Sequence, residues 1–446
     1  MTTLAACALL SRQALADDPP KDPIPDYKGT GRKPPSPSGW LWIPRVLAAP
    51  LYLVSEFGLR QPMGLLIRSA EFGHWPVHLY DFFTFDEHRA GIIPSFFVDF
   101  GTQPSVGFFF FYNDFIANRN DLRVHFGTWG LDWLNAKLID RYELETDRSW
   151  IGFEAAFTRR ADLSFYGTGP ESSKDNVARY DSTRSELAPL FIDRFWRTSV
   201  LASRVGVRWV SYGTDTCCGD PSIQERVARG DFPEPDGFGD DYFVGFERLN
   251  LTFDSREERP APGTGFRWEL LGEPVFQPRS SSPRGWIRYG TSLGGVVDLT
   301  GTQRNLSLML TAEFADPLVG GVVPFNEQII LGGGLLPAGA FMGGRMRGFR
   351  YGRLTDRSAL VAELNYSWPI WVFLDGVLAV DVGNVFGPGL DGFQADLLRM
   401  TGVFGMRTNS ERDQMFEILF GVGTETFRDG AGIESFRFAL GTQRGF

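Results

Sequence analysis

The chain lacks any apolar run long enough to cross a membrane as a helix. Such a helix needs about 18 uninterrupted apolar residues, and the nearest stretch, residues 40–54, is broken by Pro44, Arg45 and Pro50. Lysine is scarce as well, with five residues among 44 basic ones, and the formal net charge is −10. We therefore expect neither spanning helices nor a nucleic-acid partner.

Cysteine and histidine are also few, with three and four residues. Cys217 and Cys218 are adjacent, a spacing that favours neither an ordinary disulfide nor a metal site, so we expect an inert or locally oxidised pair in a loop. Pro76 lies between His74 and His78 and is expected to break the helix that would bring both to one metal. No cofactor, metal ligand or catalytic residue is predicted.

Phenylalanine and glycine are abundant instead, with 40 and 52 residues in 446, while the mean hydropathy is −0.14. Many aromatic residues in a polar-average chain are typical of strands that are apolar at every second position. Segments such as 205–209, 249–254 and 306–311 alternate in this way. About sixteen candidate strands are too many for one soluble sandwich. The sequence predicts an all-β fold, a transmembrane antiparallel barrel of about 16 strands over residues 92–446.

The segments before the barrel have three different characters. Residues 1–16 resemble a secretory signal peptide, although the positively charged beginning is missing, which suggests a truncated start. Residues 17–39 are rich in Pro, Asp, Gly and Ser and are expected to be a disordered linker. Residues 40–91 are expected to form a periplasmic or interfacial segment with one or two apolar or amphipathic helices. These helices would lie in the membrane interface or pack on each other.

An Arg- and Gly-rich stretch, residues 343–352, interrupts the strand pattern before two further strands. By alternation, Glu363 and Asp381 point into the lumen on those two strands. The spacing predicts a loop that folds into the barrel and is anchored by Arg347 to both carboxylates. We expect Arg347→Ala to lower heat resistance and abundance of the barrel.

The carboxy-terminal stretch alternates almost to the final residue. Its apolar positions and closing residues are Phe436, Phe438, Leu440, Gly441 and Phe446. One face of this last strand is expected to meet lipid, and Phe446 is expected to close the barrel against the first strand near residues 93–101.

These motifs resemble the BamA/TamA superfamily of outer-membrane assembly and translocation barrels, also described as bacterial surface antigen barrels. The sixth extracellular loop of that family carries a hydrophobic-Arg-Gly-aromatic motif, matched here by Met346, Arg347, Gly348 and Phe349. In the family the Arg reaches acidic residues on the next two strands, here Glu363 and Asp381. The carboxy-terminal series looks like the family's insertion signal.

The resemblance implies a non-enzymatic protein of the bacterial outer membrane that assists insertion or translocation of a protein or lipid client. It implies outer-membrane lipids as surroundings and the barrel assembly machinery as the partner for the chain's own insertion. Residues 40–91 lack the strand pattern of a polypeptide-transport-associated (POTRA) domain, so a POTRA-less member is expected. A passive pore, a lipid hydrolase using His125 and a homodimer remain alternatives.

Overall fold

The computed structural model describes residues 73–442 apart from 145–147, 215, 258–262, 279–282, 302, 334–344, 372–373 and 409–415, together with positions 57, 65 and 69. The predicted signal peptide (1–16) and linker (17–39) lie outside the described residues. So do the predicted apolar helices of residues 40–71, the three single positions apart, and Phe446.

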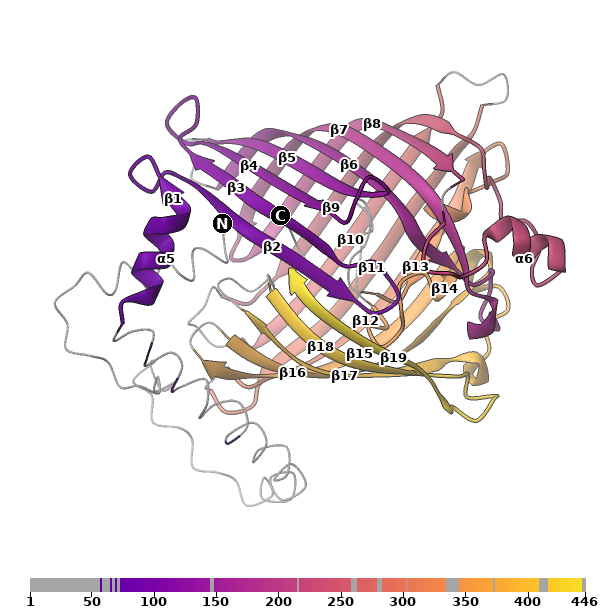
Figure 1. Ribbon diagram of the computed structural model, residues 1–446. Coiled ribbons are helices and arrows are strands. Elements are labelled where there is room, and N and C mark those ends of the chain that lie inside the picture. The colour runs from indigo at the N-terminus through magenta and orange to yellow at the C-terminus, as the bar shows by residue number, and fades with distance from the viewer. Residues whose placement is uncertain are drawn as a thin grey trace, which may run out of the picture.

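Sixteen strands form a closed antiparallel barrel, in which each strand pairs with the next along the chain and the last pairs with the first (Figure 1). This architecture confirms the predicted all-β class and strand number. The wall strands are β2 Ala90–Asp99, β3 Ser105–Asn113, β4 Asn120–Thr128, β5 Trp133–Glu143, β6 Ser149–Phe165, β7 Ala178–Trp196, β8 Ser199–Gly213, β9 Tyr242–Asp254, β10 Gly265–Phe276, β11 Gly285–Asp298, β12 Asn305–Val319, β15 Ser358–Trp371, β16 Leu374–Phe386, β17 Arg399–Thr408, β18 Phe416–Thr424 and β19 Ile433–Thr442.

Short elements occupy the two ends and the interior of the barrel. They are β1 Thr84–Phe85, β13 Ile329–Leu331, β14 Leu354–Asp356, the helices α5 Trp75–Phe83 and α6 Ile223–Arg229, and the 3-10 turns η3 Lys174–Asn176, η4 Phe325–Glu327, η5 Pro388–Leu390 and η6 Ala395–Leu397. Helix α6 begins with a capping box formed by Ser222 and Glu225 and ends at Gly230, whose φ of 79° suits a left-handed cap.

Helix α5 precedes the barrel and has Pro76 in its first turn. A proline there removes an N–H that has no helical partner, so the ring starts the helix. The expectation that Pro76 breaks a helix between His74 and His78 was therefore wrong, because His78 lies inside α5 and His74 at its N-cap. Within the described residues, no group of three or more His, Cys, Asp or Glu could hold a metal ion.

None of the helices in the described part of the chain is both long enough and apolar enough to span a membrane.

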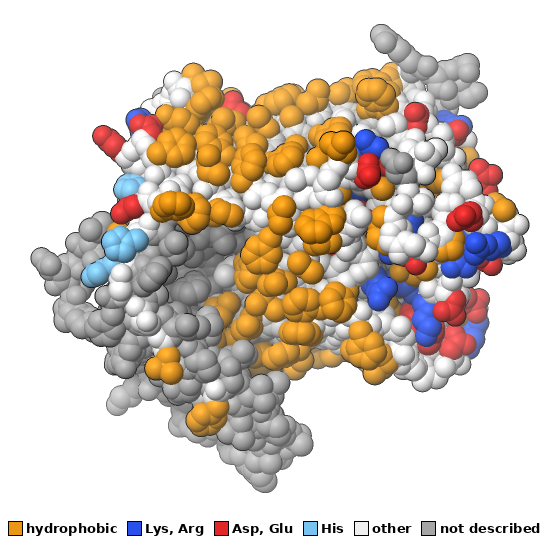
Figure 2. Space-filling model, viewed as in Figure 1, with side chains coloured by type: hydrophobic (Ala, Val, Ile, Leu, Met, Phe, Trp, Pro, Cys, Tyr) orange, Lys and Arg blue, Asp and Glu red, His pale blue; other side chains and the backbone are white. Residues whose placement is uncertain are grey.

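The strand alternation separates a lipid-facing surface from a polar lumen. On β12, Leu308 and Leu310 point outward and are 51% and 55% exposed, whereas Thr311 and Glu313 point inward and are 5% and 6% exposed. Figure 2 shows hydrophobic side chains over the outer surface of the strands and charged ones gathered at the two ends. Apolar side chains outside and polar ones inside are the arrangement of a membrane barrel.

At one end of the barrel the wall strands extend further and the connections between them are longer than at the other end. Strands β6, β7 and β8 have 17, 19 and 15 residues, more than the about 9–11 that cross a bilayer. The end of β6 beyond the membrane is buried on both faces. The long connections, including the one with α6, lie at this end (Figure 1). Because such barrels carry short periplasmic turns and long extracellular loops, this is the extracellular end.

Candidate functional site

The segment between β12 and β15 folds back into the extracellular half of the lumen. We call residues 345–353 of this segment the inner loop. Met346 and Phe349 are fully buried, and they pack in one cluster with Leu354 of β14 and with wall residues such as Val361 and Val385. Burial of these side chains holds the loop against the wall from inside.

The arginines of the inner loop meet the two lumen carboxylates in different ways. The Arg345 Nη1 atom lies 3.0 Å from Glu363 Oε2, and the Arg347 Nη2 atom lies 3.8 Å from Glu363 Oε1. Asp381 instead accepts the backbone N–H of Arg347 at 3.3 Å and the Thr401 hydroxyl at 3.1 Å. Glu363 is therefore the carboxylate that meets both guanidinium groups, while Asp381 contacts the loop backbone.

Glycines allow the loop backbone to approach β18 closely. A Cβ atom on Gly348 would overlap the Val422 carbonyl oxygen, and one on Gly421 would lie 2.8 Å from the Gly348 Cα. A Cβ atom on Gly423 would overlap the Phe349 ring. The motif glycine and these two wall glycines thus form one contact that larger residues would prevent.

A second anchor lies earlier in the same segment, at Glu327 of η4. Its carboxylate oxygens lie 3.0 Å from Arg184 Nη1 and 3.0 Å from Arg208 Nη1, and it accepts the Tyr242 hydroxyl at 2.9 Å. Arg208 also binds Glu273 of β10. Glu327 and Arg208 are completely buried, so this anchor joins the segment to β7, β8 and β9 through desolvated charges.

A third anchor connects the inner loop to the last strand. Arg353 Nη2 lies 2.9 Å from Glu434 Oε2 at the start of β19, and the Ser435 hydroxyl donates to the Gly348 carbonyl at 3.1 Å. Arg399 of β17 shares Glu434 with Arg353 at 2.9 Å. The segment is thereby fixed on three sides of the lumen.

The junction of the first and last strands lies next to this third anchor. Three register pairs join β19 to β2 among the described residues, namely Ala439 with Asp99, Leu440 with Val98, and Gly441 with Phe97. We call the β19–β2 junction the seam.

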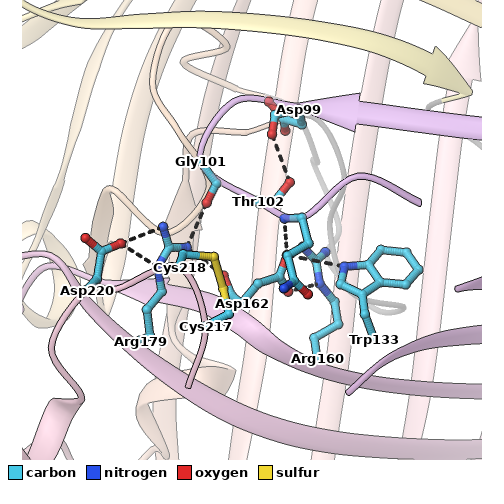
Figure 3. The surroundings of a disulfide bond; sticks show 11 residues. Asp99, Gly101, Thr102, Trp133, Arg160, Asp162, Arg179, Cys217, Cys218 and Asp220 are labelled. Atoms are coloured by element: carbon cyan, nitrogen blue, oxygen red, sulfur yellow. Dashed lines mark hydrogen bonds and ion pairs between the residues drawn. A yellow bond between two sulfur atoms is a disulfide. The ribbon is translucent and has the colours of Figure 1, made fainter. Parts of the chain in front are cut away.

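Beside the extracellular end of β2 lies the Cys217–Cys218 disulfide (Figure 3). The following Asp220 holds Arg179, whose Nη1 atom donates to the Gly101 carbonyl at 2.7 Å in the turn after β2. The disulfide itself agrees with the locally oxidised alternative for the cysteine pair.

The large apolar side chains of the carboxy-terminal series that the structure describes, Phe436, Phe438 and Leu440, lie on the lipid side of β19. Phe436 is 65% exposed, Phe438 and Leu440 are partly exposed, and the Phe438 ring packs against Phe420 with centroids 4.9 Å apart. Gly441 pairs with Phe97 of β2.

His125, the residue of the hydrolase alternative, lies on β4 in register with Lys137 of β5.

A family model described as the Omp85 superfamily domain matches residues 93–442. The chain belongs to the Omp85 superfamily. This membership confirms the resemblance to BamA/TamA-type barrels and the outer-membrane location, and it supports a general role in insertion or translocation.

The chain is also similar to solved structures at low sequence identity. The crystal structure of BamA from Haemophilus ducreyi lacking POTRA domains 1–3 matches with a TM-score of 0.55 and 13% identity over 79% of this chain and 70% of that one. CdiB from Escherichia coli matches with a TM-score of 0.48 and 12% identity over 78% of this chain and 62% of that one. No curated protein sequence matches the chain.

In this Omp85 barrel, sequence reasoning missed Arg345, Glu327, Arg208, Asp99 and Arg437 as contacts of the inner loop and the seam. The alternation placed Arg208 and Arg437 on the lumen side of their strands, which was the available signal. Their partners are as many as 338 residues away in sequence, as for Arg437 and Asp99. No local spacing could have paired them.

Proposed function

We propose that this Omp85-superfamily barrel assists the insertion or translocation of a protein or lipid client at the outer membrane, with the inner loop as a plug in the lumen. The observation that carries the proposal is the segment between β12 and β15, which is fixed at three sides of the lumen by contacts that involve Glu363, Glu327 and Glu434. A passive pore gains nothing from filling its own channel with buried charged contacts.

The extracellular mouth supports the same proposal. Phe325 of η4 packs against Phe165 and Tyr180 with ring centroids 5.3 and 5.0 Å apart, and against Phe238 of the α6 connection at 5.8 Å. Tyr351 of the inner loop belongs to the same cluster, so the aromatic residues of the mouth pack against the loop. The client would then pass through a rearranged lumen or through the seam.

Single-channel recording in planar bilayers tests the plug. We expect the purified protein to give small, flickering conductance and a variant lacking residues 345–353 to give larger and longer openings. A large and steady conductance of the unaltered protein would favour the passive pore and contradict the proposal.

A depletion strain tests the client role. Loss of the protein is expected to change the protein or lipid composition of the outer membrane, and the unaltered gene is expected to restore it. A matched strain carrying the Arg123→Met variant, altered in the wall but not in the loop, serves as the control. Unchanged composition after full depletion would exclude the insertion or translocation role, and release of fatty acids from added phospholipid would revive the hydrolase alternative.

A further inference from the structure

Side chains of the lumen join the two strands of the seam in addition to its backbone ladder. Three register pairs and a hydrogen bond from the Phe100 N–H to the Phe438 carbonyl at 3.0 Å join β2 and β19 among the described residues.

Arg437 supplies side-chain contacts across the seam. Its Nε and Nη2 atoms lie 2.7 and 3.0 Å from the two carboxylate oxygens of Asp99 on β2, a bidentate pair across the seam. Its Nη1 atom donates to the Arg347 carbonyl of the inner loop at 2.8 Å. Both charged side chains are buried, so the three nitrogens of one guanidinium serve β2 and the loop from β19.

The inner loop also touches both strands of the seam directly. On the β19 side, Ser435 and Glu434 bind Gly348 and Arg353. On the β2 side, a Cβ atom on Gly101 would lie 2.7 Å from the Arg350 Cδ atom, which places the turn after β2 against this loop side chain. The same turn is also held by Arg179, which donates to the Gly101 carbonyl (Figure 3). The loop therefore spans the seam from inside.

We propose that Arg437 couples the position of the inner loop to closure of the seam. Withdrawal of the loop removes the acceptor of Nη1, and parting of β2 from β19 removes Asp99, and either loss leaves a buried donor or charge without its partner. A seated loop therefore stabilises the closed seam, because its contacts reach both sides of the seam, and displacement of the loop weakens closure. Only the role of seam opening in client transfer rests on the proposed function. The coupling between the loop and the seam is a property of the barrel and does not depend on that function.

A pair of cysteines at Val98 and Leu440, which are register partners in the seam, measures its closure. The pair is placed in the full chain with Cys7, Cys217 and Cys218 replaced by serine, and the rate of disulfide formation under a mild oxidant is followed in phospholipid vesicles. Conductance in planar bilayers reports the position of the loop.

We expect Arg437→Met to slow disulfide formation by about fivefold or more, the scale of a coupled transition, and to lengthen the open periods. Locking the seam with the Val98–Leu440 disulfide should return the conductance of Arg437→Met to that of the parent, and a dithiol reductant should release it. This reversal is the readout that a merely structural arginine would not give.

Arg123→Met is the matched control, because Arg123 is also a buried wall arginine but its hydrogen-bond partners, Asn113, Asp121 and two strand carbonyls, are on β3 and β4. It should change neither readout. Heat-modifiable gel mobility shows whether Arg437→Met is folded. If it is not, Asp99→Asn is used in its place. Unchanged cross-linking and conductance in a folded variant, or openings that persist with the seam locked, would overturn the coupling. Normal coupling with no client defect would overturn the proposed function alone.

Discussion

Gly348 shows how one residue type controls the seating of the inner loop. Its backbone lies against β18 at a place where a Cβ atom would overlap the Val422 carbonyl oxygen. Two further glycines of β18, Gly421 and Gly423, lie against the loop backbone and the Phe349 ring. The motif glycine is therefore required by close approach and not by a left-handed backbone.

Gly348→Ala is expected to destabilise the barrel by about 1–3 kcal/mol, the usual effect of overpacking. Chemical unfolding of the purified protein in detergent measures the change. Gly402→Ala is the control, since its Cβ would meet the Val422 Cγ2 atom at an ordinary 3.5 Å. Equal losses of stability in both variants would show that the close contact between Gly348 and β18 does not cause the effect.

The two lumen carboxylates should respond differently to neutralisation. Glu363→Gln leaves the guanidinium groups of Arg345 and Arg347 without their carboxylate and is expected to cost about 3–5 kcal/mol, as for a broken buried pair. Asp381→Asn keeps an oxygen that can accept the Arg347 N–H and the Thr401 hydroxyl, so about 1 kcal/mol is expected. Unfolding midpoints of the two variants compare them directly, and the reverse order would contradict the contact geometry.

At the scale of elements, the segment between β12 and β15 behaves as one inserted unit with several anchors. The antiparallel β13–β14 pair connects them, with η4 just before β13 at one end of this short ladder and the inner loop just before β14 at the other end. Glu327 therefore anchors the same segment as the Arg-Gly motif does, but at a different place along it. Loss of either anchor should loosen the other.

Glu327→Gln is expected to lower stability by about 3–5 kcal/mol, because Arg184 and Arg208 keep their charges in a buried place. It should also lengthen channel openings in planar bilayers, since η4 and the inner loop move together. The control is Glu171→Gln, whose pair with Arg428 is 65% exposed on the Glu171 side and should contribute about 0–1 kcal/mol. If the Glu327→Gln protein is destabilised but its channel openings are unchanged, the Glu327 anchor does not control the plug, and the prediction is wrong.

At the scale of the whole molecule, the barrel is apolar outside and charged inside. The large hydrophobic residues of the wall are half exposed, while many arginines and carboxylates are buried in the lumen. This is the reverse of a soluble protein, and it follows from lipid as the outer solvent.

Leu310→Arg, near the middle of β12, is expected to cost about 2–4 kcal/mol in a bilayer, whereas Leu318→Arg, near the extracellular end of the same strand, should cost about 0–1 kcal/mol. Both leucines are about half exposed to the outside. Folding equilibria in phospholipid vesicles measure the difference. Equal costs would contradict the placement of β12 across the membrane.

Much of the architecture could be predicted from the chain. Alternation gave the strand number and the inward faces, so that Glu363 and Asp381 were placed on the lumen side before any contact was known. The helix at Pro76 was misjudged because a proline in a first turn and a proline in a helix interior look alike in sequence. The site was predicted in part, since the motif named Arg347 but not Arg345 or Glu327.

The sequence by itself determined which side chains face lipid and which face the lumen, because a strand has a period of two and that period is local. Only the tertiary structure decided which lumen charges meet. Asp99 and Arg437 are brought together by closure of the barrel, and Glu327 reaches Arg208 because the loop returns into the lumen. Pairing across a closed barrel depends on register and loop path, and neither is written in the spacing of neighbouring residues.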